Sequence, residues 1–146
     1  MAFPIVRSPG FAKVVPIMEN GDVVLVRQYR YAVGGITLEV PAGAIDAGEA
    51  PIETARRELG EEALVMSDHL EPLGEFTTSP GRMDERGYVF LARACRPDPT
   101  AVQHEPTLPV HMPLDDAVEL IGGDVLAATS SLALLLAQRR LRGEDR

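Results

Sequence analysis

The sequence contains a single cysteine, Cys95, so no disulfide can form within the chain. A lone thiol suits a reducing compartment, and Cys95 follows an apolar run, so we expect a small core residue rather than a reactive one. No apolar run approaches the roughly 20 residues needed to span a bilayer, and the first residues lack the apolar segment of a secretion signal. These absences predict a soluble protein with no membrane partner, and we expect a cytoplasmic location.

Positive charge is also scarce. The chain has 14 Lys and Arg against 22 Asp and Glu, which gives a net charge of −8. A surface this acidic repels the phosphates of nucleic acids and anionic lipids, so a nucleic-acid partner is not expected. A protein of this charge that handles an anionic substrate needs local positive charge, which bound metal ions or a few placed arginines supply.

The 146 residues show no internal repeat and no low-complexity tract, and we interpret 1–146 as one globular domain. Two Val- and Ile-rich runs, 11–18 and 22–29, flank an Asn-Gly step that is typical of a β-hairpin. Further strands are expected at 36–40, 70–78, 87–94 and 108–112, and helices at 50–64, 115–121 and 125–140. Strands and helices mixed in this way predict an α+β or α/β layered domain.

Three segments are expected to lie outside this regular structure. Residues 41–48 and 79–86 are rich in Gly, Pro and polar side chains and are interpreted as loops. The segment 96–109 carries four prolines and is expected to be a surface excursion. Within the last helix, 132–137 is apolar on every side, which indicates burial or a subunit contact.

The chemistry is expected in the first long helix. Glu58, Glu61 and Glu62 follow the spacing i, i+3, i+4, so they project from one side of a helix. Each like-charge pair at this spacing costs about 0.2–0.5 kcal/mol, and a divalent cation would offset far more than that. Carboxylate oxygens suit magnesium or manganese. The alternative interpretation is a solvated acidic helix face.

The surrounding residues favour the metal site. Gly43 is followed after five residues by Glu49, then after seven more by Arg57-Glu58-Leu59-Gly60-Glu61-Glu62, and Val65 closes the run. This pattern resembles the Nudix box, and the resemblance implies a Nudix-type α/β/α sandwich with a mixed β-sheet and a catalytic loop–helix–loop. The family usually has glycine where this chain has Leu64, and this departure implies a different exit from the helix.

The resemblance also implies roles for these residues. A site for two or three Mg²⁺ or Mn²⁺ ions would be formed by carboxylates and one backbone carbonyl, those of Glu58, Glu62, Glu61 and Ala42. Arg57 would orient the glutamates by ion pairing. Glu49 would be structural and would tie the loop to the helix.

Features outside the box resemble the ADP-ribose pyrophosphatase branch of the family. They are Ser79-Pro80-Gly81, with Pro80 fifteen residues after Val65, together with Arg27-Gln28-Tyr29-Arg30 and Glu39-Val40-Pro41-Ala42-Gly43. The resemblance implies hydrolysis of ADP-ribose to AMP and ribose 5-phosphate. The alternatives are another nucleotide-sugar or dinucleotide diphosphatase, and a non-catalytic nucleotide-sensing module on the same fold.

The same resemblance implies further site residues. The expected substrate contacts are Arg30, Arg27, Glu39 and Gly81, and arginine matches phosphate with two parallel donors. Glu85 is the expected general base, with Asp84 as its rival, and Glu61 and Arg57 complete the expected catalytic set. Members of this branch usually carry a longer N-terminal section that pairs across a homodimer. This chain begins almost at the core, so we expect either a short or a truncated member, and a homodimer.

Overall fold

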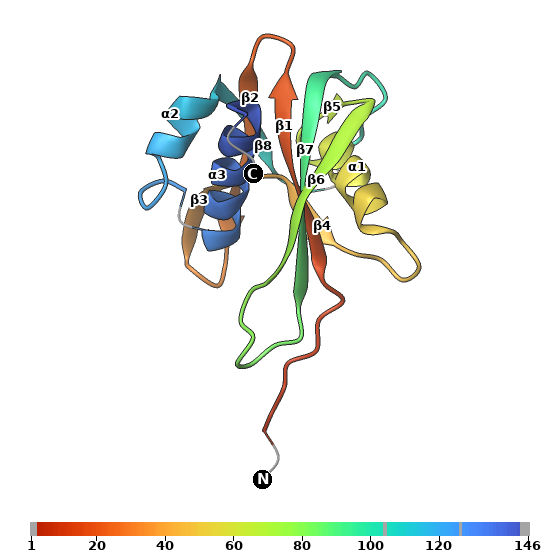
Figure 1. The fold of residues 1–146 in the computed structure, drawn as a ribbon, viewed down its shortest axis with the longest axis vertical. Helices are drawn as coiled ribbons and strands as arrows, with labels where there is room; N and C mark the ends of the chain where they lie inside the picture. The colour runs from red at the N-terminus through yellow and green to blue at the C-terminus, as the bar shows by residue number, and fades with distance from the viewer. Residues whose placement is uncertain (1–2, 104, 126, 144–146) are drawn as a thin grey trace.

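Strand β1 (Phe11–Met18) lies at the centre of a mixed sheet (Figure 1). It pairs in parallel with β7 and antiparallel with β2 and β4. The computed structural model describes residues 3–103, 105–125 and 127–143. The other elements are β2 (Asp22–Arg30), β3 (Gly35–Glu39), β4 (Ala42–Ala44), α1 (Pro51–Glu61), β5 (Val65–Met66), β6 (His69–Thr77), β7 (Arg86–Pro97), β8 (Leu108–Pro113), α2 (Leu114–Glu119) and α3 (Ala128–Leu141).

Helices cover the sheet on both sides, α1 on one and α2 with α3 on the other (Figure 1). Alternation along β1 divides its side chains between the two layers. Ala12 and Val14 belong to the core that includes Leu59 of α1, whereas Val15 and Ile17 belong to the core that includes α3. The mixed sheet and its two helical layers confirm the expected α/β/α sandwich.

The hairpin, the three helices and most strands occur where the sequence predicts them, but several bounds differ and two short strands were not predicted. The segment 41–48 is not wholly a loop, because Ala42–Ala44 pairs with β1 from Phe11 to Lys13. The strand Val65–Met66 was not expected and pairs with the end of β7, which continues to Pro97. The last helix begins at Ala128 rather than at 125; Leu126, within the expected range, is outside the described residues.

The first helix ends at Glu61, three residues before the expected end. Leu64 has a φ of 57°, which is the left-handed conformation that glycine adopts most readily. After the helix, the backbone at Leu64 therefore has the conformation that glycine favours. The prediction that leucine at this position gives a different exit from the helix is wrong.

Two expectations about buried residues are met. Cys95 lies in the core, and burial raises the pKa of its thiol to about 11, so it is not a reactive thiolate. In the apolar stretch of α3, Ala133, Leu134 and Ala137 are buried against the sheet while Leu135 stays exposed. Within the described part of the chain, no helix is long and apolar enough to cross a membrane.

Candidate functional site

Arg57 connects the β4–α1 loop to the glutamates of α1. Its guanidinium donates to Glu49 Oε1 at 3.1 Å, to Glu58 Oε1 at 2.6 Å, to Glu61 Oε2 at 3.1 Å and to the carbonyl of Ala44 at 3.1 Å. The hydrogen bond to Glu49 and the surrounding carboxylates raise the pKa of Arg57. The same bond, joined by one from Thr54, lowers the pKa of Glu49 to about 2. The ion pairs expected of Arg57 and the tie expected of Glu49 are both present.

The three glutamates line one cavity of about 220 Å³, together with β4. Glu58 and Glu62 are buried and Glu61 is half-buried. Glu62 accepts a hydrogen bond of 2.8 Å from the backbone N–H of Ala42. The structure therefore brings the expected metal ligands to one place: the three glutamate carboxylates and Ala42, whose backbone carbonyl is the fourth expected ligand.

The buried carboxylates of Glu58 and Glu62 are not fully neutralised by the cations around them. Burial, together with the negative charges of the neighbouring Glu58 and Glu105, raises the pKa of Glu62 to about 7. Burial also raises the pKa of Glu58, because the attraction of Arg57 does not cancel the cost of desolvation. Buried acidic oxygens with too few cations around them are a donor set that suits a hard divalent ion.

As they stand, no three His, Cys, Asp or Glu side chains in residues 3–103, 105–125 and 127–143 are grouped closely enough to hold a metal ion. Arg57 lies between Glu58 and Glu61, and the Ala42 amide engages Glu62. The residues fit the metal in chemistry and in location, while their side chains are held by protein partners.

Gly43 provides space in this cavity. A Cβ atom at this position would lie 1.8 Å from Oε1 of Glu58 and 2.4 Å from its Cδ. Any side chain at residue 43 would therefore displace the Glu58 carboxylate, so the present position of this carboxylate beside β4 requires glycine here.

A second cavity, of about 320 Å³, shares β4 with the first and is lined by Phe11, Lys13, Arg30, Thr78, Glu85 and Thr129. Glu85 accepts hydrogen bonds from Ser8 Oγ at 2.8 Å and Thr78 Oγ1 at 2.7 Å. Asp84, its rival as general base, is instead paired with Arg7 at 2.7 Å and does not line either cavity. Of the two candidates, only Glu85 lines one of these cavities, and its role as general base remains a prediction.

Arg30 and Glu39 form a pair joined by two hydrogen bonds beside this second cavity. Arg30 Nε and Nη2 donate to the two carboxylate oxygens of Glu39 at 2.8 and 3.0 Å, and Thr37 donates to the same carboxylate at 2.6 Å. Burial would raise the pKa of Glu39, but these hydrogen bonds outweigh it and lower the pKa. The structure thus brings together two of the four expected substrate contacts.

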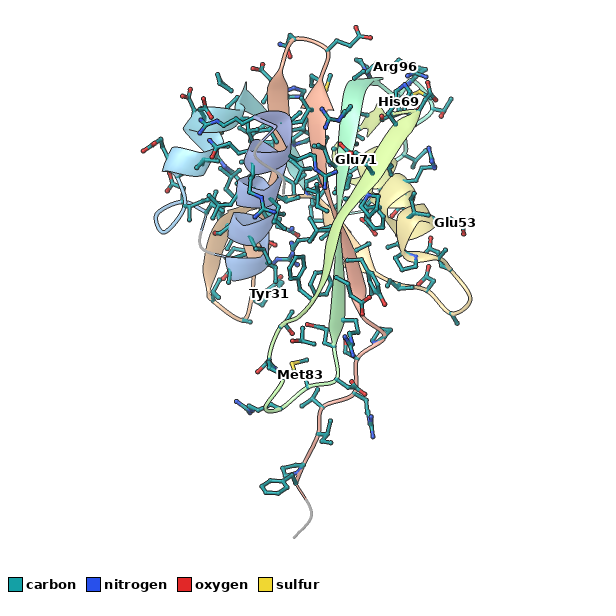
Figure 2. All side chains as sticks on the ribbon, viewed as in Figure 1. Tyr31, Glu53, His69, Glu71, Met83 and Arg96 are labelled. Carbon is teal, nitrogen blue, oxygen red and sulfur yellow. The ribbon has the colours of Figure 1, made fainter. Side chains whose placement is uncertain are left out.

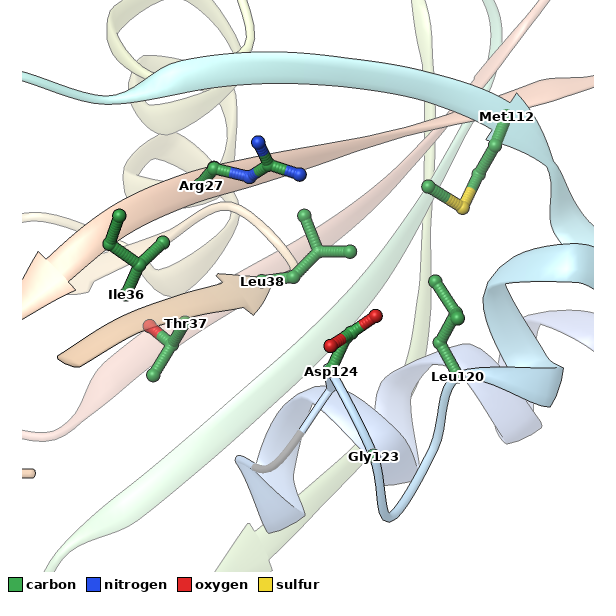
Figure 3. Close-up of a pocket in the computed structure, with 8 residues that line it drawn as sticks. All are labelled: Arg27, Ile36, Thr37, Leu38, Met112, Leu120, Gly123 and Asp124. Atoms are coloured by element: carbon green, nitrogen blue, oxygen red, sulfur yellow. The ribbon is translucent and has the colours of Figure 1, made fainter.

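The other two expected substrate contacts lie elsewhere. Arg27 is three residues from Arg30 on the same strand, so the two side chains leave opposite faces. Arg27 lines a separate cavity of about 390 Å³ with Leu38, Met112 and Asp124 (Figure 3). Gly81 is exposed in the β6–β7 loop and lines neither of the two cavities that share β4. Their expected roles remain predictions.

Sequence reasoning missed several residues of the two cavities. Glu105 lines the carboxylate cavity from the Pro-rich segment, and no local pattern indicates it. Lys13 lines the second cavity, and the sequence does contain a signal for it, because it is the one charged residue within an otherwise apolar strand. Desolvation lowers the pKa of Lys13 to about 8, against the attraction of Glu39 and Glu62.

The chain is similar in sequence to several curated proteins. The ADP-ribose pyrophosphatase of Bacillus subtilis (strain 168) is 40% identical over 88 residues, which are 60% of this chain and 48% of that protein. The methanol dehydrogenase activator of Bacillus methanolicus is 35% identical over 120 residues, which are 80% of this chain and 65% of that protein. The chain thus spans between about half and two thirds of the length of these curated relatives.

The chain is also similar to a solved structure and to a family model. A crystal structure of an ADP compounds hydrolase superimposes with a TM-score of 0.82 at 27% identity, covering 94% of this chain and 75% of the other. The family model of the NUDIX domain matches residues 9–140. The chain therefore belongs to the Nudix domain family.

Proposed function

We propose that the protein is a metal-dependent hydrolase that cuts the diphosphate bond of a nucleoside diphosphate linked to another moiety, with ADP-ribose as the substrate and AMP and ribose 5-phosphate as products. The observation that carries this proposal is the presence of two cavities that share β4 as a wall, one lined by three glutamates and the other by Arg30, Lys13 and Glu85. The names of relatives that act on ADP-ribose and on ADP compounds support the substrate class.

The carboxylates of Glu58, Glu61 and Glu62 and the carbonyl of Ala42 would hold two or three Mg²⁺ or Mn²⁺ ions. When bound, such ions supply charge neutralisation at the diphosphate and a lowered pKa for water. Raised pKa values and burial of Glu58 and Glu62 support this part of the proposal, since a cation would compensate both. Arg57 keeps Glu58 and Glu61 oriented, and Glu49 fixes Arg57.

The chain's own residues divide the remaining work. Arg30 has three N–H groups beyond those given to Glu39, and they bind oxygens of the diphosphate. Glu85 accepts a proton from the attacking water as its oxygen bonds to phosphorus. The bond from that phosphorus to the bridging oxygen breaks, and the bridging oxygen leaves with the other phosphate.

A panel of nucleotide diphosphate compounds tests the proposal. ADP-ribose, other nucleotide sugars and dinucleotides are incubated with Mg²⁺, with Mn²⁺ or with a chelator, and the products are identified by chromatography. We expect AMP and ribose 5-phosphate from ADP-ribose with either metal and no product with the chelator. Faster turnover of another compound would assign that substrate instead, and binding of nucleotides without turnover would indicate a sensing module.

A further inference from the structure

Lys13 is the only lysine of the 146 residues, and it is buried. It is the third residue of β1, on the same face as Val15 and Ile17, which pack toward α3. A buried ammonium is costly unless it is paired and hydrogen-bonded. The partners of Lys13 therefore indicate why the chain keeps a charge at this position.

Those partners come from two other elements. The ammonium lies 3.2 Å from Ser130 Oγ on α3, 3.5 Å from the carbonyl of Val40 and 3.9 Å from Oε2 of Glu39. Ser130 Oγ also accepts a hydrogen bond of 3.1 Å from the backbone N–H of Val40. Lys13 thereby connects β1, the end of β3 and the first turn of α3 at a single point.

The network continues from Glu39 to Arg30. Glu39 receives both hydrogen bonds from Arg30 and one from Thr37, so its position fixes the plane of the Arg30 guanidinium. Arg30 and Glu39 alone would be a neutral pair. With Lys13 the group of three carries a net charge of about +1, next to a cavity that would receive a diphosphate.

We propose that Lys13 is a positioning residue: it holds Glu39, and through Glu39 it fixes Arg30 in the orientation that binds the diphosphate. This inference rests on the proposed function of Arg30. A direct contact between Lys13 and substrate is less compatible with the structure, because this buried ammonium already donates hydrogen bonds to Ser130 and Val40 and forms an ion pair with Glu39.

A double-mutant cycle separates positioning from a general structural role. We expect Lys13→Met to raise the KM for ADP-ribose about 5- to 20-fold with kcat changed less than about threefold, and Arg30→Ala to raise KM at least as much. Lys13→Met in the Arg30→Ala background should then add less than about twofold, because the residue on which Lys13 acts is gone. Additive effects of the two substitutions would overturn the inference.

Two further variants keep the test decisive. Ser130→Ala removes one acceptor of the ammonium and keeps the charge, so it should raise KM by a smaller factor; it replaces Lys13→Met in the cycle if that variant does not fold. Arg96→Met is the control: it removes a cation whose partner is the exposed Asp68. Arg96 lies at the end of β7 opposite the loop that carries Met83 (Figure 2), so this substitution should leave KM unchanged.

Failure of the proposed function gives a different result. If the wild-type protein hydrolyses no nucleotide, the same cycle is measured by calorimetry as the Kd for inorganic diphosphate. Non-additive weakening would then support the role of Lys13 without a reaction. Additive weakening, or no binding of diphosphate to the wild type, would contradict it.

Discussion

At the scale of single residues, the contact between Gly43 and Glu58 is the most sensitive point of the site. A methyl group at residue 43 would overlap the Glu58 carboxylate, so the carboxylate would have to shift from its present position in the cavity. We expect Gly43→Ala to lower kcat/KM at least about tenfold, because misplacing a catalytic group by an ångström costs about that much or more. Steady-state kinetics with ADP-ribose measures this.

Gly60 offers the matched control for that variant. It lies in α1, and a Cβ atom there would be 3.7 Å from Asp98 Oδ2, an ordinary contact. Gly60→Ala should raise the free energy of unfolding by about 0.5–1 kcal/mol through helix propensity and leave kcat/KM unchanged. Equal kinetics for the two alanine variants would contradict the close approach of β4 to the carboxylates.

Glu62 tests the metal site directly. Glu62→Gln keeps the shape of the side chain and removes the charge, and we expect a loss of about 10²-fold or more in kcat, comparable to the loss of one preorganised electrostatic contact in other enzymes. Glu53→Gln is the control, since Glu53 is an exposed glutamate on the same helix (Figure 2). Unchanged turnover in a folded Glu62→Gln would remove this residue from the mechanism.

How far the sequence predicts the site depends on whether the contacts are local. The spacing of Glu58, Glu61 and Glu62 places them on one helical face without knowledge of the fold, and the structure agrees. Arg27 and Arg30 could also have been separated, because three residues along a strand reverse the face. Glu105 could not be predicted, since only the path of the Pro-rich segment brings it to the cavity.

At the scale of secondary-structure elements, the exit of α1 is where sequence pattern and backbone disagree. Leu64 holds a left-handed φ of 57°, which costs a residue with a Cβ about 1–2 kcal/mol. We expect Leu64→Gly to be more stable than Leu64→Ala, since both lose the side chain and only glycine relieves the strain. The difference should be about 0.5–1 kcal/mol in chemical denaturation, because the greater freedom of glycine in the unfolded chain offsets part of the relieved strain.

The outcome that would contradict this is an alanine variant as stable as the glycine variant or more stable. Both variants should keep wild-type kcat/KM, because Leu64 does not line the carboxylate cavity. A loss of activity in both would show that the exit of the helix positions the glutamates.

The short strands show why the elements were only partly predictable. The β4 and β5 strands have three and two residues, too few for a periodic pattern, and they exist because β1 and β7 present edges to them. The long strands and α1 carry their own periodicity, so local pattern and tertiary structure agree there. The sequence therefore does not predict short strands that form only because they pair with a neighbouring strand.

At the scale of the whole molecule, the homodimer remains a prediction. Three apolar side chains at the end of the β2–β3 hairpin, Tyr31, Val33 and Ile36, are 66–91% exposed, and Tyr31 is at the tip of this region (Figure 2). Apolar residues gathered on a surface are typical of a protein contact. We expect sedimentation to give twice the chain mass of 15.8 kDa and Tyr31→Glu to shift the protein toward monomer. A wild-type monomer at micromolar concentration would contradict this.

The central claim is that the buried glutamates of α1 hold divalent cations that neutralise a diphosphate. Isothermal titration of Mn²⁺ into the metal-free protein, with and without AMP, tests it most directly, with Glu62→Gln and Glu53→Gln titrated in parallel. We predict heat of binding for the wild type and for Glu53→Gln, and its loss or strong weakening for Glu62→Gln. No uptake of the ion by the wild-type protein, with or without nucleotide, would contradict the account.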